Sequence, residues 1–412
     1  MKILIVHNSY QQPGGEDVVF EQERRLLKRA GHNVITYHRS NWEVRAYSGL
    51  SQVQLALRTI WSTETRKEIS QLLKHEKPDL VHVHNTFVMI SPSIFAACRQ
   101  VGVPVVQTLH NYRLYCPAAT LFRDGHTCED CVERSLWQGV AHGCYRDSRM
   151  ATAGVALMLV VRRQRQTTQD VDCYIALSGF ARSKFVEAGL PEDKVLVKPN
   201  FVHPDPGING NSERNYVLFV GRISGGRIRL MLAAWARLNK LRIPLVIIGG
   251  GPELPQLEKE ASRCGLTEVR FLGQLPRDQT LAAMHRARFL VFPSEWYENF
   301  PLTIAESFAC GVPVICSRLG AMQEIVEDGR TGLHFTTSDA ADLASRVEWA
   351  WNHPEGMEVM GKEARREYED KYTAEKNYPM LMEIYQCALG KGRQLFQMSP
   401  GSLTEAVSKH MV

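Results

Sequence analysis

Short runs of apolar residues alternate along this chain with longer stretches in which apolar residues recur at helical spacing. The run at 3–6 is followed by such a stretch at 16–30, and Gly31 then marks the end of a helix. Further apolar runs lie at 34–37, 80–83, 105–109 and 174–176. Short apolar runs separated by helices are typical of a parallel sheet that helices cover on both faces.

The pattern is interrupted once and then restarts. Residues 202–215 are rich in Pro, Gly, Asn, Ser and Asp, which predicts a linker. Beyond it, 216–220 predicts a strand and 229–241 a helix, and further strands are predicted at 245–248, 269–272, 289–292 and 314–316. We therefore expect an α/β protein with two Rossmann-like domains, 1–201 and 215–375, then a helix at 376–390 and a mobile tail at 391–412.

Composition supports two domains and limits the classes of ligand that we expect. A chain of 412 residues is too long for one ordinary core, and 44% hydrophobic with 23% charged residues is ordinary for a globular protein. The net charge of +5 suits anionic ligands or an anionic membrane surface, and it is too small to predict nucleic-acid binding. The longest apolar run, 150–161, is too short to span a bilayer, and no secretory signal is visible, so we expect a cytoplasmic protein.

The strongest signal of chemistry lies at 292–317, which reads FPSEWYENFPLTIAESFACGVPVICS. A strand leads into a turn, and a helix starts near Pro301, so Glu298 falls in the loop and Glu306 about a turn and a half into the helix. Free N–H groups of the loop and of the helix N-terminus bind anionic oxygens. A carboxylate inside the helix can accept both hydroxyls of a ribose diol. Together these features indicate a nucleotide that carries a polyhydroxylated group.

This segment resembles the signature of the retaining glycosyltransferases of family 4, which have the GT-B fold. The resemblance rests on the two glutamates, on Asn299-Phe300-Pro301-Leu302 between them and on the sequence ACGVPV at 309–314, and it extends over roughly 1–385. It implies two Rossmann-like domains that face each other across a cleft, with the last helix crossing back to the first domain. It also implies that a sugar moves, with retention, from a nucleoside-diphosphate sugar to a hydroxyl of a glycan or glycolipid acceptor.

The resemblance also implies roles for individual residues. Glu306 would hold the ribose, and Glu298 with the N–H groups of 300–302 would bind the sugar hydroxyls. His110, which ends a strand of the first domain, matches the active-site histidine near the donor sugar; a hydrogen-bonded structural histidine is the alternative. The catalytic set is then His110, Glu298 and Arg222. The donor-binding set is Gly14, Gly15, Arg222, Arg227, Glu298, Asn299, Phe300, Pro301, Leu302 and Glu306.

Two loops complete the expected donor site. In the family, an Arg and a Lys five positions later grip the diphosphate; here Arg222 matches and Arg227 takes the Lys spacing, but Ile228 replaces the following Gly, so the loop looks one residue short. Cations and backbone N–H groups can neutralise a leaving diphosphate, so we expect no cofactor to be required for chemistry. Gly14 and Gly15 would let the backbone approach the donor, with the adjacent Glu16 and Asp17 serving the helix dipole.

Two groups of residues resemble metal sites. His82 and His84 share one face of a strand, but no third ligand lies near them in the sequence, so we predict no metal there. Cys128 and Cys131 form a Cys-x-x-Cys pair, and Cys116 and Cys144 flank it at 12 and 13 positions. Four thiols in this pattern suit a structural zinc ion. A metal-free cysteine-rich acceptor loop and a redox pair are the alternatives.

Three questions about partners and activity stay open at this point. The stretch 150–161, followed by Arg162, Arg163 and Arg165, suits either a basic amphipathic helix on an anionic membrane or a buried helix with a polar end. The same fold could carry a nucleotide-sugar epimerase, which would need no acceptor. The changed Arg227 loop also suits a catalytically weak scaffold in polysaccharide assembly.

Overall fold

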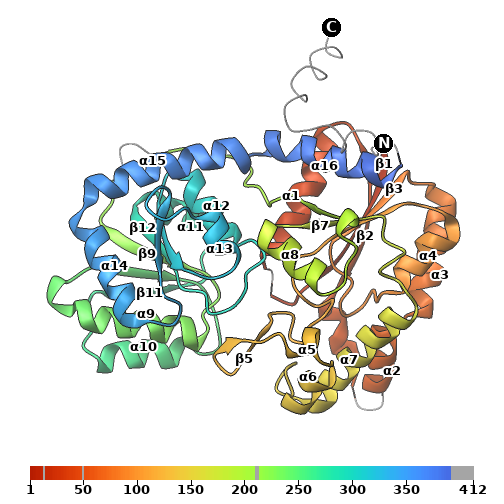
Figure 1. The fold of residues 1–412 in the computed structure, drawn as a ribbon, viewed down its shortest axis with the longest axis horizontal. Coiled ribbons are helices and arrows are strands. Elements are labelled where there is room, and N and C mark those ends of the chain that lie inside the picture. The colour runs from red at the N-terminus through yellow and green to blue at the C-terminus, as the bar shows by residue number, and fades with distance from the viewer. Residues whose placement is uncertain (13, 49–50, 209–212, 391–412) are drawn as a thin grey trace, which may run out of the picture.

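The computed structural model describes residues 1–12, 14–48, 51–208 and 213–390, so the expected tail at 391–412 lies outside the described residues. Two six-stranded parallel sheets form the centres of two domains that lie side by side (Figure 1). The first sheet has the order β2-β1-β3-β4-β7-β8, with bounds Asn33–Ser40, Lys2–Ser9, Leu80–Val83, Val105–Thr108, Cys173–Ala176 and Val195–Val197. The second has the order β11-β10-β9-β12-β13-β14, with bounds Val269–Gly273, Leu245–Ile248, Tyr216–Val220, Ala287–Phe292, Val314–Ser317 and Gly332–Phe335.

Helices cover both sheets, as the alternating pattern predicts. The helices of the first domain are α1 (Gly15–Arg29), α2 (Ser51–Ile60), α3 (Thr63–Glu76), α4 (Ser93–Val101), α5 (Asp130–Glu133), α6 (Trp137–His142), α7 (Arg149–Gln164) and α8 (Gly179–Glu187). Those that follow the linker are α9 (Gly225–Leu238), α10 (Leu254–Arg263), α11 (Arg277–His285), α12 (Leu302–Ala309), α13 (Ala321–Ile325), α14 (Ala340–Asn352), α15 (Pro354–Lys371) and α16 (Ala374–Ala388). The central strands are almost fully buried, because helices pack on both faces of each sheet.

Some boundaries differ from those expected from the sequence. Helix α9 begins at Gly225, four residues before the predicted start at 229, and it ends at Leu238 instead of 241. Its first two residues are glycines that fit a crowded space: a Cβ on Gly226 would lie 2.1 Å from Oε2 of Glu295. Glycine normally weakens a helix, so the pattern alone placed the start too late. Strands β8 and β14, which each lie at one edge of their sheet, were missed.

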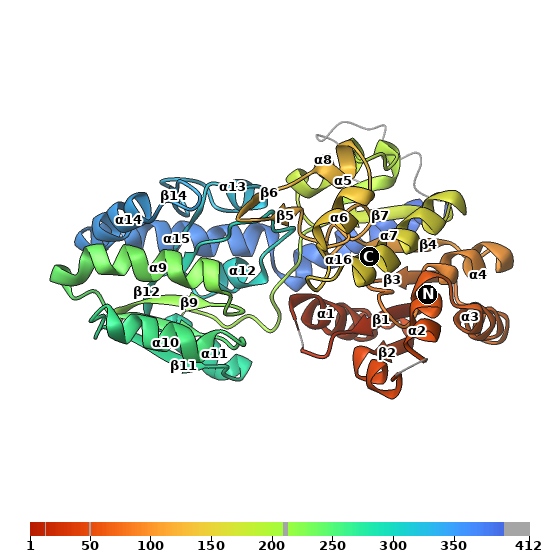
Figure 2. The same cartoon turned by 90° about the horizontal axis from the view of Figure 1, so that it is seen from below.

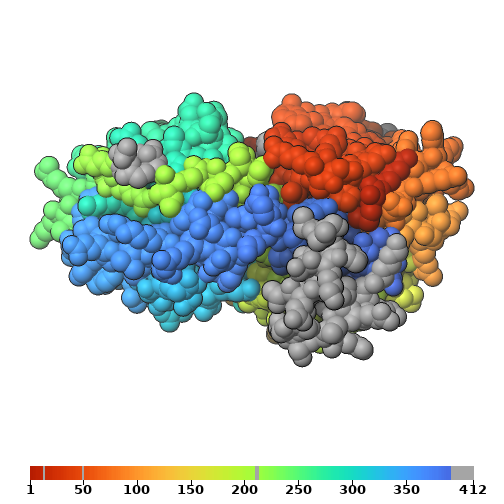
Figure 3. Space-filling view, turned by 90° about the horizontal axis from the view of Figure 1, so that it is seen from above, coloured from red at the N-terminus to blue at the C-terminus, as the bar shows by residue number. Residues whose placement is uncertain are grey.

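The last two helices join the domains. Figure 3 shows them as a continuous band across both halves of the molecule, and α16 packs against α1 and β4 of the first domain. This confirms the predicted crossing back of the last helix. The hydroxyl of Tyr385 on α16 lies 2.8 Å from Nδ1 of His82 on β3, and the N–H of Val202 donates to the carbonyl of Tyr372 at 2.9 Å.

Strand order locates the ligand cleft. In the first sheet β2 lies on one side of β1 and β3 on the other, and in the second sheet β10 and β12 flank β9 in the same way. Ligands of such sheets bind at the carboxyl ends of the strands where the order reverses. The loops after β1, β9 and β12 leave these two reversal points, and they face each other between the domains (Figure 2).

Candidate active site

A cavity of about 510 Å³ lies between the domains at these two reversal points. The first domain contributes Gly14, Gly15, Glu16 and His110, and the second contributes Arg222, Arg227 and the run Glu298–Thr303. All residues predicted for the donor site except Glu306 therefore line one cavity. Its size and its convergent polar groups suit a nucleotide sugar.

The glutamate of the loop after β12 is held in place by an arginine. The buried guanidinium of Arg227 bonds to Glu298, and it donates from Nη2 to Oγ of Ser294 at 2.9 Å. It also stacks on Trp296, with 3.5 Å between the guanidinium carbon and the ring centroid. Burial lowers the pKa of Arg227, although Glu298 acts in the opposite direction. The observed contacts of Arg227 thus position Glu298, and its expected role at the diphosphate stays a prediction.

The second glutamate lies deeper in the same wall. Glu306 is the fifth residue of α12, and its Oε1 accepts a hydrogen bond from Nε of Arg277 at 3.0 Å. Burial raises the pKa of Glu306, and the charge of Arg277 opposes that rise. Glu306 does not line the cavity itself; Leu302 and Thr303, one turn earlier on the helix, do. The N-terminus of α12 opens into the cavity without a side-chain cap, so its N–H groups are available to an anion.

Arg222 is the positive charge with the freest access to the cleft. It is exposed, it lines the cavity, and no ion pair joins it to another described residue. Two glycine-bearing turns stack behind it: Ile223 donates its N–H to the carbonyl of Gly250 at 3.0 Å, and a Cβ on Gly251 would lie 2.1 Å from the carbonyl oxygen of Ile223. Glycine is thus required at 251 because the turn after β10 packs directly on the turn that carries Arg222.

The opposite wall presents His110, which is held by a second histidine. Nε2 of His110 lies 3.0 Å from Nδ1 of His84, and Nε2 of His84 lies 3.3 Å from the carboxylate of Glu23. Burial lowers the pKa of both histidines, so they are neutral near pH 7. In the neutral state Nδ1 of His84 can accept from Nε2 of His110, and Nε2 of His84 lies beside the Glu23 carboxylate without a hydrogen bond. This leaves Nδ1 of His110 as an acceptor for a ligand.

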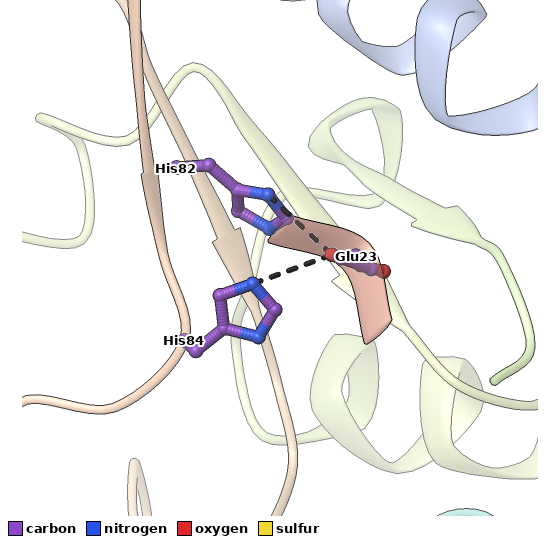
Figure 4. Close-up of side chains that lie close together, drawn as sticks. All are labelled: Glu23, His82 and His84. Carbon is purple, nitrogen blue, oxygen red and sulfur yellow. Dashed lines mark ion pairs between the residues drawn. The ribbon is translucent and has the colours of Figure 1, made fainter. Parts of the chain in front are cut away.

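Glu23 is the third ligand group that the sequence did not reveal near His82 and His84. Figure 4 shows its carboxylate beside both imidazole rings. Glu23, His82 and His84 each offer one possible metal-ligand atom, and these three atoms lie within 4.8 Å of one another. However, Nζ of Lys198 lies 2.7 Å from the other oxygen of Glu23. Burial alone would raise the pKa of Glu23, but Lys198 and the histidines hold it well below its usual range. The carboxylate is therefore paired with a lysine cation, which fits a structural network better than a metal ion.

Glu16 is a candidate functional residue that sequence reasoning missed. Its position in the first turn of α1 suggested a dipole role, but its side chain lines the cavity and receives hydrogen bonds from the Nδ2 atoms of Asn85 and Asn111. Asn85 follows β3 and Asn111 follows β4, so these partners meet only in the folded sheet. The local signal that could have pointed to Glu16 was its place directly after Gly14-Gly15.

The four cysteines share a small lobe between β4 and α7. The lobe contains a short hairpin, β5 (Phe122–Arg123) with β6 (His126–Thr127), and the two short helices α5 and α6. All four cysteines are free thiols, and a redox pair stays a prediction. Burial raises the pKa of Cys128 and Cys131, against hydrogen bonds from the backbone N–H groups of Asp130 and Gly139.

These contacts fit a metal site in part. Backbone N–H groups that point at thiol sulfurs would also stabilise metal-bound thiolates, which carry negative charge. On the other hand, no three of the four described sulfurs lie within 4.8 Å of one another. The structural zinc ion stays a prediction, as does the metal-free acceptor loop.

The stretch at 150–161 lies in α7, for which the sequence suited either a basic amphipathic helix or a buried helix with a polar end. Val155 and Leu159 are buried, and Arg162 is also buried, where it donates from Nη2 to Oε1 of Gln107 at 2.9 Å. Arg162 therefore does not face a membrane, contrary to the basic-helix reading. Arg163 and Arg165 are exposed, and so is Met150.

A second cavity of about 420 Å³ adjoins the first. Tyr10, Gln12 and Arg222 line both cavities. The lining of the second is mixed: Val44, Leu55, Ala56, Phe87, Val88, Met150 and Val155 are apolar, and Gln11, Asn41, Gln52 and Arg146 are polar. All of its lining residues except Arg222 belong to the first domain.

Comparison with known proteins agrees with this geometry. Residues 205–367 match the family described as glycosyl transferases group 1, and residues 13–206 match glycosyltransferase family 4. The chain belongs to the group 1 glycosyltransferases, with the GT-B fold. The expected fold and family are thereby confirmed.

Among the curated relatives of this group 1 glycosyltransferase are D-rhamnosyltransferase WbpZ of Pseudomonas aeruginosa, O-antigen chain mannosyltransferase C of Escherichia coli and sulfoquinovosyl transferase SQD2 of Arabidopsis thaliana. They are 33%, 28% and 27% identical over 32%, 54% and 71% of this chain. The matches span 35%, 62% and 54% of those proteins' own lengths.

Solved structures show the same fold. A glycosyltransferase of Rickettsia africae has a TM-score of 0.68 at 15% identity, and the match covers 94% of this chain and 98% of that one. HepE of Anabaena in complex with UDP and glucose has a TM-score of 0.64 at 18% identity, with 93% and 98% coverage.

Within the described residues, no helix is both long enough and apolar enough to cross a membrane.

Proposed function

We propose that the protein transfers a glycosyl group, with retention, from a nucleoside-diphosphate sugar to a hydroxyl of a glycan or glycolipid acceptor. One observation carries the proposal: the uncapped N-terminus of α12, Arg222 and Glu298 converge on one cavity that faces His110. A helix N-terminus and an arginine bind a diphosphate, and a carboxylate with an imidazole suits sugar hydroxyls. Retention rests on the resemblance of the segment 298–306 to the family signature.

The chemistry follows from where the charges lie. The anomeric carbon forms a bond to the acceptor oxygen and loses its bond to the phosphate oxygen, whose electron pair leaves with the nucleoside diphosphate. The proton of the acceptor hydroxyl passes to that departing phosphate oxygen, on the face where the new bond forms. Arg222 and the N–H groups of α12 stabilise the charge that grows on the diphosphate, so no metal is required for this step.

Assembly of a polysaccharide or glycolipid is the proposed context. The relatives include an O-antigen chain mannosyltransferase and a phosphatidyl-myo-inositol mannosyltransferase of Mycobacterium leprae, the latter 30% identical over 54% of this chain. The apolar side chains of the second cavity would suit the lipid part of such an acceptor, because this cavity shares Tyr10 and Gln12 with the donor cavity.

Peripheral contact with an anionic membrane is part of the proposal. Helices α2 and α7 pack together and expose Val53, Leu57 and Met150, which are 62%, 62% and 87% exposed. The exposed Arg146, Arg149, Arg163 and Arg165 accompany them. Apolar side chains with basic neighbours suit the surface of an anionic bilayer, at the inner face if the protein is cytoplasmic as expected.

A stability screen followed by a product assay tests the function. A bound nucleotide sugar raises the melting temperature by mass action, so UDP-, GDP-, ADP- and dTDP-sugars can be ranked directly. The hit is then incubated with and without acceptor, and NMR reads the anomeric configuration of the product. A retained configuration and acceptor-dependent consumption support the proposal. An epimerase would convert the donor without acceptor, and a scaffold would bind it without converting it.

A further inference from the structure

Two neighbouring acids at the start of α1 have different surroundings. Both oxygens of Asp17 are engaged within the first domain: Oδ2 accepts from the N–H of Gly14 at 2.7 Å, and Oδ1 lies 2.8 Å from Nε2 of His7. Asp17 thus caps the helix. Glu16 is not needed for this purpose, and its side chain turns into the cleft.

Two asparagines hold the Glu16 carboxylate in a defined orientation. Nδ2 of Asn85 donates to Oε1 at 2.7 Å, and Nδ2 of Asn111 lies 3.3 Å from Oε2. The amide oxygens are fixed in turn, because Oδ1 of Asn85 accepts from the N–H of Phe87 and Oδ1 of Asn111 accepts from the N–H of Arg113. The Nδ2 donors must therefore face Glu16. Each carboxylate oxygen can still accept another hydrogen bond.

Glu16 also lies close to the junction of the two cavities. Tyr10, which lines both cavities, is near enough for the charge of Glu16 to raise its pKa. Arg222 lines both cavities from the other domain. A ligand that reaches from the second cavity to the donor sugar would therefore pass Tyr10 and Glu16.

We propose that Glu16 binds the acceptor through a hydroxyl next to the one that reacts. This rests on the proposed function. The reacting hydroxyl has one proton, and transfer places that proton on the departing phosphate oxygen, so the carboxylate is left for a neighbouring hydroxyl. The acceptor class is then an amphipathic glycoside: its sugar carries adjacent hydroxyls at the reacting end, and its apolar group occupies the second cavity.

The charge state of Glu16 gives the proposal a pH signature. Burial, followed by the charge of Asp17, raises the pKa of Glu16 to about 8, although Arg113 and the two asparagines act against the rise. Tyr10 and Arg222 also border this part of the cleft. The carboxyl is thus mostly protonated at pH 7, and its ionised fraction grows about tenfold by pH 9. If the ionised form binds the acceptor, the acceptor KM falls by about the same factor.

Substitution of Glu16 by glutamine tests the role, because glutamine keeps the size and cannot ionise. The assay uses the nucleotide sugar found in the stability screen as donor and a panel of octyl β-glycosides as acceptors. Glu16→Gln should raise the acceptor KM about tenfold at pH 9 and remove its pH dependence. Glu16→Asp should keep a pH-dependent KM. Glu21→Gln is the matched control, since Glu21 pairs with Arg24 and Arg25 on the surface of the same helix.

Acceptors that lack single hydroxyls identify the contact. If Glu16 binds one hydroxyl, removing that hydroxyl and substituting Glu16 should have non-additive effects on KM. Additive effects for every deoxy acceptor, or an unchanged pH dependence in Glu16→Gln, would overturn the proposal. So would a wild-type protein that hydrolyses the donor but transfers to none of the octyl glycosides. A wild-type protein that binds no nucleotide sugar would instead refute the proposed function.

Discussion

The two walls of the cleft are built in different ways. The donor wall takes Glu298, the run to Leu302 and the N-terminus of α12 from one continuous segment, and it adds Arg222 from the loop after β9. The acceptor wall takes Glu16 from the first turn of α1 and His110 from the loop after β4, and Asn85 from the loop after β3 orients Glu16. A wall from a single segment is visible in residue spacing, whereas a wall from several segments exists only once the sheet has formed. Residues of the donor wall can therefore be predicted from one segment of sequence, whereas the residues of the acceptor wall are brought together only by the folded sheet.

The largest expected effect is on the donor wall. Arg222→Ala should lower turnover about 100- to 1000-fold, because it removes a positive charge that would stabilise the developing charge on the diphosphate. Arg227→Ala should cost less, since the Arg227 guanidinium is engaged by Glu298 and Ser294. Steady-state rates measure both.

Arg229→Ala is the control. Arg229 lies on α9, as Arg227 does, but it pairs with Glu253 and Glu260 outside the cavity. Equal losses in Arg222→Ala and Arg227→Ala would show that both arginines act on the diphosphate and that the shortened loop is fully functional.

The next effect concerns the ribose. Glu306→Ala should weaken nucleotide binding by about 2–3 kcal/mol, the scale of lost hydrogen bonds to a charged group. Calorimetry with a nucleoside diphosphate and its 2′-deoxy form measures it, and the deoxy form should lose little further affinity in the variant. An unchanged affinity in Glu306→Ala would remove the ribose role, and Arg277 would then be its only partner of consequence.

The same division explains what could be read from the sequence. The alternating pattern gave both sheets, and strands such as β3, β9 and β10 lie where it placed them. It missed β8 and β14, which are edge strands, and it delayed the start of α9 past two glycines. In these cases tertiary packing, which local propensity does not contain, decides the structure.

The candidate site divides in the same way. Glu298 and Asn299–Leu302 were found from the resemblance of their segment to the family signature, and the structure brings them to one cavity with Arg222 and His110. Glu16 was assigned to the helix dipole, since its asparagine partners are 69 and 95 positions away. The Glu23 carboxylate beside His82 was missed for the same reason, because 59 positions separate the two residues in the sequence.

A smaller effect is expected from the cysteine lobe of the acceptor wall. If Cys116, Cys128, Cys131 and Cys144 hold zinc, elemental analysis should find about one zinc ion per chain. Chelation should then lower the melting temperature and acceptor transfer, with nucleotide binding intact, because the donor wall lies in the other domain. Cys264→Ser is the control, since Cys264 is exposed on the second domain. If the protein contains no metal and transfers at the full rate, the zinc hypothesis is wrong and the cysteines belong to a metal-free acceptor loop.

The smallest effect is expected at the proposed membrane face. Leu57→Ser with Met150→Ser should reduce binding to phosphatidylglycerol-containing vesicles several-fold, because less apolar surface enters the bilayer. Exposed positions tolerate such changes, so stability should hold within about 0.5 kcal/mol. Sedimentation with vesicles measures the binding, and Val359→Ser is the control, since Val359 is exposed on α15 of the other domain. Equal binding of all variants would contradict a membrane role for α2 and α7.

The central claim is that the two walls have separate duties, and the ratio of donor hydrolysis to transfer tests it most directly. One chromatographic assay of a single reaction gives both products for the wild type, Glu306→Ala and Glu16→Gln. Loss of a donor contact should slow both reactions equally, so the ratio in Glu306→Ala should equal that of the wild type. Loss of an acceptor contact should slow transfer alone, so at pH 9 and an acceptor concentration below KM the ratio in Glu16→Gln should rise about tenfold. A raised ratio in Glu306→Ala together with an unchanged ratio in Glu16→Gln would contradict the account.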